Sequence, residues 1–136
     1  KTQVLYDDLK VTANVVEFID DSPQALADCD VFVGRSGAST VSELAALGVA
    51  SILIPYPHHK DQQQLHNARI LDGVGAAKVL PQVGLTKEML AAEIAALSRT
   101  NCLAMSLNAI EVAKPNATAE ICAVIELLAA ANGGMR

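Results

Sequence analysis

The sequence predicts an α/β fold in which helices flank a parallel sheet, and three observations support this class. Four short apolar runs have the length and composition of buried strands, at 15–19, 31–34, 51–55 and 76–80. Helical patterning fills the intervals between the last three runs, and strands that alternate with helices at this spacing form βαβ units with parallel strands. After Gln82 only helical patterning remains, which predicts a helical C-terminal segment.

The first helices are marked by residues that start and stop helices. A helix is predicted over 23–29, because Ser22 is suited to cap it and Pro23 is tolerated at the first helical position. A second helix is predicted over 39–47, where Gly48 supplies the left-handed residue that commonly ends a helix.

The later elements follow from loop composition and helical periodicity. A loop rich in proline and histidine over 56–61 leads to a predicted helix over 62–71. Beyond the last strand, three further helices are predicted, over 86–97, 101–112 and 117–130.

Composition favours one globular domain and argues against nucleic acid or a membrane span. Of 136 residues, 51% are hydrophobic and 18% are charged, which is enough apolar material for one core. We therefore expect one domain over 1–136 and, because the chain opens at Lys1 rather than Met, a domain cut from a larger protein. The formal net charge of −5 argues against a nucleic-acid surface, and no apolar window is long enough to span a membrane.

Small residues join an apolar strand to a helix in the segment 34–43, which is Gly-Arg-Ser-Gly-Ala-Ser-Thr-Val-Ser-Glu. The first turn of a helix has unpaired N–H groups and partial positive charge, so it attracts anions. Gly37 and Ala38 let a phosphate approach the backbone, and Glu43 lies where a carboxylate can accept hydrogen bonds from a sugar diol. The pattern predicts a nucleotide or sugar-nucleotide diphosphate site. The candidate residues are Arg35, Ser36, Gly37, Ala38, Ser39, Thr40, Val41, Ser42 and Glu43.

An ordinary helix cap is the alternative interpretation of these residues. The run Thr40-Val41-Ser42-Glu43 matches a capping box, in which the threonine and glutamate side chains pair with backbone N–H groups at the helix start. Neither common glycine-rich nucleotide motif is present. A cap accounts for Thr40 and Glu43 but not for the small residues before them.

Two further clusters are expected near this turn. Ligands of open parallel sheets bind at the carboxyl ends of the strands. Ile19 ends the first predicted strand, and a run of glutamines follows the third strand at the start of a helix. Gln63, Gln64 and Asn67 lie within about one helical turn of one another and offer donors and acceptors suited to sugar hydroxyls. A solvated helix start is the simpler alternative for this cluster.

Together these segments resemble the MurG family of peptidoglycan glycosyltransferases. The matching motifs are Arg-Ser-Gly-Ala-Ser-Thr-Val-Ser-Glu at 35–43, Ile-Pro-Tyr-Pro-His and Lys-Asp-Gln-Gln within 54–63, and Asn-Ala-Arg at 67–69; Phe-Ile-Asp-Asp at 18–21 and Gly-Ala-Ala-Lys-Val-Leu at 75–80 also match. Members transfer N-acetylglucosamine (GlcNAc) from UDP-GlcNAc onto undecaprenyl-diphospho-muramoyl-pentapeptide (lipid I), which makes lipid II. The resemblance implies the C-terminal, donor-binding half of a GT-B glycosyltransferase, with a Rossmann-like sheet.

The resemblance also implies a role for each matching residue. Ile19 would bond the uracil edge through its backbone, residues 38–40 would hold the diphosphate, and Glu43 would bind the ribose hydroxyls. The cluster of Gln63, Gln64 and Asn67 would hold the GlcNAc hydroxyls. The loop before it is one residue longer than the family's usual loop, so which of the glutamines at 62–64 faces the sugar stays open.

The same resemblance implies what these residues do not supply. The acceptor-binding half, with its catalytic base and its membrane-facing patch, has no counterpart here, so we expect donor binding without a catalytic residue, metal or cofactor. Through that half the whole protein would meet lipid I at the cytoplasmic face of the cell membrane. The first strand of the donor half is also missing, and the open sheet edge would allow a homo-oligomer.

Metal chemistry is disfavoured by the placement of the candidate ligands. The tripeptide Asp-Cys-Asp at 28–30 spells the Asp-x-Asp metal-diphosphate motif, but it ends a helix and begins a strand, at the opposite rim of the sheet. Three histidines near Asp61 offer a second possibility, although adjacent histidines point in different directions. They are His58, His59 and His66. Solvated loop histidines are the simpler interpretation.

Three other functions stay open from the sequence. The chain would suit a stand-alone soluble subunit of a two-chain UDP-GlcNAc transferase, which pairs with a membrane-anchored partner. It would also suit a UDP-GlcNAc 2-epimerase-like enzyme, which shares the two-domain architecture, or a non-catalytic nucleotide-binding module.

Overall fold

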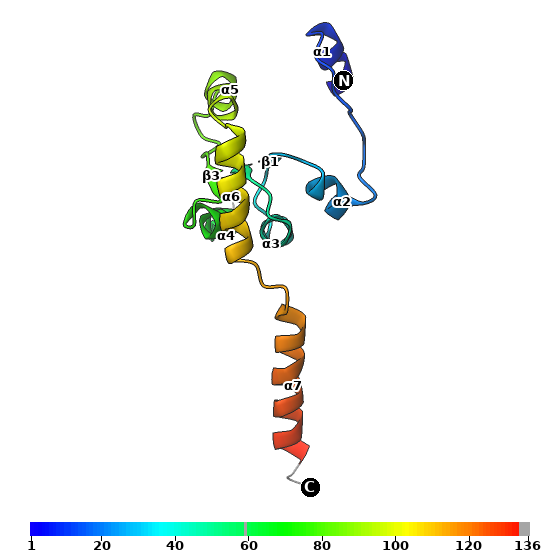
Figure 1. Ribbon diagram of the computed structural model, residues 1–136, viewed down its shortest axis with the longest axis vertical. Coiled ribbons are helices and arrows are strands. Elements are labelled where there is room, and N and C mark those ends of the chain that lie inside the picture. The colour runs from blue at the N-terminus through cyan, green and yellow to red at the C-terminus, as the bar shows by residue number, and fades with distance from the viewer. Residues whose placement is uncertain (59, 134–136) are drawn as a thin grey trace.

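A three-stranded parallel sheet lies in the middle of the chain in the computed structural model, which describes residues 1–58 and 60–133 (Figure 1). The strands are β1 (Phe32–Gly34), β2 (Ser51–Leu53) and β3 (Ala77–Val79), in the order β1-β2-β3. Phe32 pairs with Ser51, and Ser51 pairs with Ala77, so the strands begin level with one another. The predicted parallel sheet is confirmed for the last three apolar runs.

Two helices connect the strands and lie side by side. Helix α3 (Ala38–Leu47) joins β1 to β2, and α4 (Gln63–Asp72) joins β2 to β3. Helices α5 (Lys87–Ala95) and α6 (Arg99–Glu111) follow, and α6 packs against α3. This arrangement brings the N-termini of α3 and α4 to the edge of the sheet where β1 and β2 end.

The core lies between the sheet and these helices. All three residues of β2 are buried, as expected for the central strand of a parallel sheet covered by helices. The largest fully buried hydrophobic side chains are Leu44, Ile52, Leu53 and Leu71. Helix α3 therefore contributes one face to the core and leaves its N-terminal turn for another contact.

Gly48 ends α3 in the left-handed conformation, with φ 67° and ψ 49°. A Cβ added there would lie 2.8 Å from Cδ1 of Ile110 and 3.2 Å from Oγ of Ser106, both on α6. We expect Gly48→Ala to lower the free energy of unfolding by about 2–3 kcal/mol, because backbone strain and overpacking add. Urea denaturation of the two proteins measures this difference.

Gly84→Ala is the matched control for this substitution. Gly84 also has a positive φ, of 81°, but nothing lies within 4 Å of an added Cβ. It should therefore lose only the backbone contribution, about 1 kcal/mol. Equal losses in the two variants would show that the contact with α6 contributes nothing.

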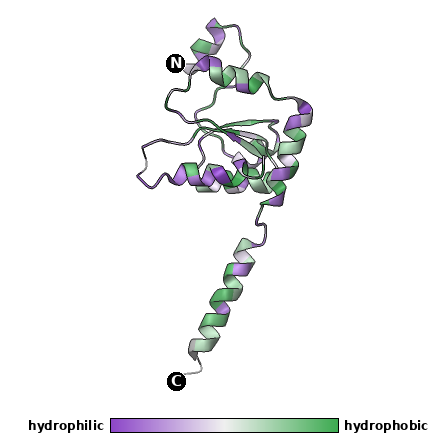
Figure 2. Cartoon of the chain, turned by 90° about the vertical axis from the view of Figure 1, so that its left-hand side faces the viewer, coloured by the Kyte–Doolittle hydropathy of each residue, from purple (hydrophilic) through white to green (hydrophobic). Residues whose placement is uncertain are grey.

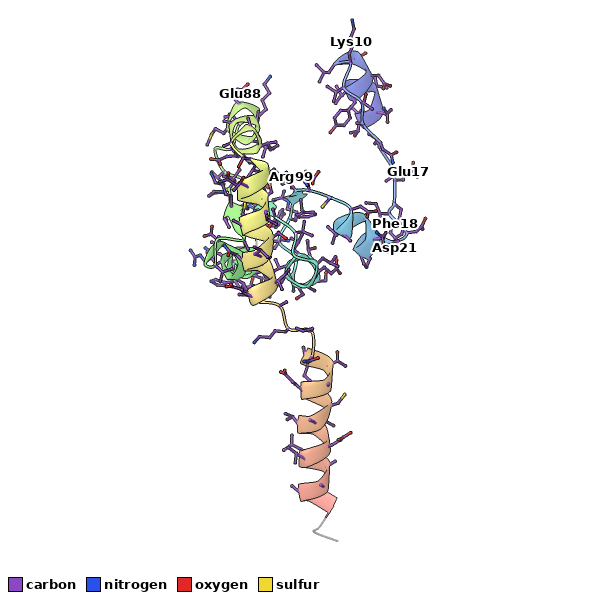
Figure 3. All side chains as sticks on the ribbon, in the orientation of Figure 1. Lys10, Glu17, Phe18, Asp21, Glu88 and Arg99 are labelled. Atoms are coloured by element: carbon purple, nitrogen blue, oxygen red, sulfur yellow. The ribbon has the colours of Figure 1, made fainter. Side chains whose placement is uncertain are left out.

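The strand predicted over 15–19 is wrong. The segment before α2 (Ser22–Ala27) leaves the sheet and joins no strand among the described residues, and Phe18 and Asp21 lie on it away from β1 (Figure 3). The side chain of Phe18 is 77% exposed. A short apolar run predicts the conformation of a strand, but a strand also needs a hydrogen-bonding neighbour, and β1 has none on its outer edge within the described part of the chain.

Helix starts were predicted less well than helix bodies. Asp21 caps α2, accepting from the N–H of Gln24 at 2.9 Å, so the predicted cap at Ser22 is one residue late. Helix α1 (Thr2–Asp8) was not predicted, and it has no side-chain cap or buried residue to signal it. Ser98 caps α6 by accepting from the N–H of Asn101, and the helix begins at Arg99, two residues before the predicted start.

The C-terminal helix α7 (Ala117–Gly133) confirms the predicted helical segment and projects away from the sheet (Figures 1 and 2). Its large apolar side chains are exposed. Figure 2 shows in green the hydrophobic residues along this helix. Across the described ranges, no helix combines the length and the apolar character that crossing a membrane requires.

Candidate functional site

The N-terminus of α3 presents backbone N–H groups that no protein group caps. Gly37 is the N-cap, with extended backbone (φ −61°, ψ 155°), and its carbonyl accepts from the N–H of Val41 at 3.0 Å. Within residues 1–58 and 60–133, the amides of Ala38, Ser39 and Thr40 donate no hydrogen bond. Thr40 lies inside the helix, so the capping-box alternative is wrong. These amides converge at the positive end of the helix dipole, where an anion is stabilised.

A cavity of about 480 Å³ lies beside this turn. It brings together four of the predicted site residues, which come from two separate segments: Ile19, Ser39, Thr40 and Glu43. Leu26 and Phe32 add apolar wall that the sequence analysis missed. Helical spacing alone would have placed Leu26 on the sheet-facing side of α2. A pocket with apolar walls and a few polar groups at one end is the usual form of a ligand site.

Helix α3 divides its residues between this cavity and the core. Val41 is 4% exposed and packs in the core, and Ser42 is exposed. Glu43 lines the cavity one turn after the uncapped amides, and the next residue, Leu44, is fully buried. Among the predicted residues of this helix, Glu43 is thus the carboxylate that lines the cavity.

A second group of predicted residues is joined by hydrogen bonds across the molecule. The hydroxyl of Ser36 donates to the carbonyl of Gln64 at 2.7 Å. Nδ2 of Asn67 donates back to the carbonyl of Ser36 at 3.2 Å. Ser36 is fully buried, one residue before the N-cap of α3. These two bonds attach the turn before α3 to the first turns of α4.

Gln64 and Arg35 attach the loop after β2 to the same place. Oε1 of Gln64 accepts from the N–H of Tyr56 at 2.9 Å. Nη1 of Arg35 donates to the carbonyl of Ile54 at 2.9 Å, and its guanidinium lies over the Tyr56 ring at 5.6 Å from the centroid. Arg35 therefore braces the loop in addition to carrying a charge near the turn.

The glutamines at the start of α4 face different surroundings. Gln62 lines a separate apolar cavity of about 190 Å³ with Pro55, Pro57 and Leu65. Gln63 is exposed, and its side chain makes no hydrogen bond to another residue that the structure describes. Gln64 already uses its amide oxygen on Tyr56. Gln62 and Gln63 therefore both have side-chain amides free of hydrogen bonds to described residues, and Gln62 lines the other cavity.

The metal alternatives gain no support from the geometry. The described portion of the chain holds no group of three His, Cys, Asp or Glu side chains placed to bind a metal ion, and His59 lies outside it. Asp28 accepts from Nε2 of Gln24 at 2.8 Å at the end of α2. Its role in the Asp-x-Asp tripeptide is therefore that of a helix-end residue.

An uncapped helix start beside a cavity, at the carboxyl end of a parallel strand, is the arrangement that anion sites take in α/β domains. Residues 1–121 match the family model described as the glycosyltransferase family 28 C-terminal domain, and the chain belongs to that family. It is 48% identical over 124 residues to a UDP-N-acetylglucosamine--N-acetylmuramyl-(pentapeptide) pyrophosphoryl-undecaprenol N-acetylglucosamine transferase of Polynucleobacter asymbioticus. The match covers 89% of this chain and 35% of that protein. The Haemophilus influenzae protein of the same name is 44% identical over 122 residues, which are 90% of this chain and 34% of the relative.

Solved structures show the same relationship. The crystal structure of Acinetobacter baumannii MurG superimposes with a TM-score of 0.87 and 37% identity, over 92% of this chain and 37% of that one. The glycosyltransferase SnogD from Streptomyces nogalater superimposes with a TM-score of 0.52 and 25% identity, over 82% and 29% of the two chains. The chain thus spans about a third of the length of these relatives. The MurG-family prediction and the predicted fold, the C-terminal half of a GT-B glycosyltransferase, are confirmed.

Proposed function

We propose that this chain is the UDP-GlcNAc-binding half of an inverting N-acetylglucosaminyltransferase that converts lipid I to lipid II in peptidoglycan synthesis. The supporting observation is the row of uncapped amides at Ala38, Ser39 and Thr40, beside a cavity that also contains Ile19 and Glu43. The names of the relatives, which describe this transfer, support the same reaction.

Each part of the donor has a complementary group at this site. The uracil would pair with the backbone of Ile19, and the cavity wall at Phe32 would cover its ring. The diphosphate would accept from the α3 amides, which need no reorganisation to receive it. The carboxylate of Glu43 would accept from the ribose hydroxyls through charge-assisted hydrogen bonds.

We place the binding site for the sugar at the start of α4. The side-chain amides of Gln62 and Gln63 are both free, but Gln62 lines the separate apolar cavity, so we assign the GlcNAc hydroxyls to Gln63. Gln64 and Asn67 each keep one end of the amide for the same purpose, Nε2 and Oδ1 respectively.

These groups favour transfer by stabilising the leaving group. In an inverting reaction the acceptor hydroxyl attacks the anomeric carbon, and the bond from that carbon to the UDP oxygen breaks. Negative charge then grows on the diphosphate, where the α3 amides and the helix dipole already point. The base that takes the hydroxyl proton would come from the acceptor-binding half.

The whole protein would place this domain in a larger assembly. We propose that residues 1–136 form one donor-binding unit, and that lipid I and the cytoplasmic membrane face are met through the other half. The open outer edge of β1 would pair with a further strand there or, in the isolated chain, with a second copy.

Thermal denaturation with added nucleotides tests the donor proposal. UDP at about 100 times its Kd should raise the free energy of unfolding by about 2.7 kcal/mol and the melting temperature by about 5–10 °C. Uridine lacks the diphosphate and ADP lacks the uracil, so each should give a smaller rise. The same rise for all three ligands, or none for UDP, would contradict the assignment.

A further inference from the structure

The turn that receives the diphosphate and the helix that receives the sugar are tied by two reciprocal hydrogen bonds. Ser36 Oγ donates to the carbonyl of Gln64, 28 residues away, at 2.7 Å. Asn67 Nδ2 donates to the carbonyl of Ser36, 31 residues away, at 3.2 Å. We call this pair of bonds the Ser36–Asn67 clamp.

Among the described residues, the local support for the start of α4 is a long bond from the N–H of Gln63 to Asp61 Oδ1, at 3.4 Å. The N-cap of this helix, Gln62, has no side-chain cap bond and lies in the left-handed region, with φ 50° and ψ 32°. For a residue with a side chain that conformation costs about 1–2 kcal/mol. The position of this turn therefore depends on contacts from elsewhere in the chain, namely the clamp and the bond from the N–H of Tyr56 to Gln64 Oε1.

The side chains of the clamp have few polar atoms left to bind a ligand. Ser36 is fully buried, and its hydroxyl proton is used on Gln64. Asn67 is half-buried, and its donor is used on Ser36. Ser36 is thus not placed to touch the donor, whereas Asn67 keeps Oδ1 for it and uses only Nδ2 in the clamp.

We infer that Ser36 and Asn67 are positioning residues, which hold Gln63 at the distance from the α3 amides that a sugar diphosphate requires. The inference rests on the proposed function. In a ligand whose sugar and diphosphate are covalently joined, the second contact adds affinity only if the protein holds both binding elements at matching spacing. A loose α4 would first have to be ordered, and that cost would cancel part of the gain.

The clamp therefore predicts a selective defect. Ser36→Ala removes one clamp bond, and Asn67→Asp removes the donor of the other while keeping an acceptor oxygen for the sugar. Both variants should leave the affinity for UDP nearly unchanged, because the α3 amides remain. The gain in affinity from UDP to UDP-GlcNAc, expressed as the ratio of the two Kd values, should fall by about three- to tenfold, the effect of one hydrogen bond. Global destabilisation would weaken the binding of both ligands equally and leave the ratio of the two Kd values unchanged.

Titration calorimetry of the 136-residue chain with each ligand measures this ratio, and the chain offers a control for each variant. Ser51→Ala also removes a fully buried hydroxyl, one that has no hydrogen-bond partner among the described residues. Asn108→Ala also removes a side-chain amide that donates to a backbone carbonyl. The acceptor is the carbonyl of Gly75, at 3.4 Å, which follows the C-terminal end of α4. Both controls should keep the wild-type ratio.

The outcomes separate the clamp from the donor proposal. A lower ratio in both clamp variants, with wild-type ratios in both controls, supports the clamp. An unchanged ratio in Asn67→Asp overturns it even if Ser36→Ala fails to fold, and so does a wild-type chain that binds UDP and UDP-GlcNAc equally. A wild-type chain that binds neither ligand overturns the proposed function, and the clamp with it.

Discussion

Leu44→Ala is expected to lower the free energy of unfolding by about 3–5 kcal/mol, the largest effect of any single truncation proposed for this chain. Leu44 is fully buried on the core face of α3, against the sheet and its covering helices. Its removal leaves a cavity that neighbouring side chains fill only in part. Urea denaturation followed by far-UV circular dichroism measures the loss.

Leu47→Ala on the same helix is the control. Leu47 is 39% exposed, so its truncation should cost under about 1.5 kcal/mol. If the two variants lost the same free energy of unfolding, burial of Leu44 in the core would not be the source of its contribution to stability. The fraction of Leu44→Ala that remains folded should still bind UDP, since the α3 amides are backbone groups.

Glu43→Ala, one residue earlier, should do the opposite and lower the affinity for UDP by about 10- to 100-fold with little change in stability. Glu43 lines the cavity next to the uncapped turn and is partly exposed, so little packing is lost. Hydrogen bonds from ribose hydroxyls to a carboxylate contribute about 1.5–3 kcal/mol. Titration calorimetry gives the two dissociation constants.

A ligand lacking the 2′-hydroxyl shows whether the ribose is the partner. The wild-type chain should bind 2′-deoxy-UDP more weakly than UDP, and Glu43→Ala should bind the two alike. If the variant still distinguished them, Glu43 would not contact the ribose. Glu120→Ala, in exposed α7, should behave as wild type.

The sequence was sufficient for features set by local chemistry. Apolar runs bounded by glycine and proline predicted β1, β2 and β3, and Gly48 correctly predicted where α3 ends. The motif at 35–43 helped to predict the family and the position of the uncapped first turn of α3. These features depend on a few neighbouring residues, whose conformational preferences are strong.

Features that depend on distant partners were not predictable. The run at 15–19 has the pattern of a strand but lies off the sheet, because its pairing needs a neighbour that local pattern cannot supply. Likewise, Gln63, Gln64 and Asn67 are equivalent as polar residues on one helix turn. Only the fold shows that the side chain of Gln64 is bonded to the loop after β2 and that of Asn67 to Ser36, whereas the side chain of Gln63 makes no such bond.

Backbone amides recognise oxyanion geometry rather than the identity of the molecule that carries it. The bare first turn of α3 should therefore accept inorganic phosphate, sulfate or pyrophosphate as well as a nucleotide. Such ions would act as competitive inhibitors, raising the apparent dissociation constant of the donor in proportion to their concentration. The choice of buffer salt thus sets the working range of any titration on this domain, and the cytosolic phosphate pool would set the donor level needed to saturate it.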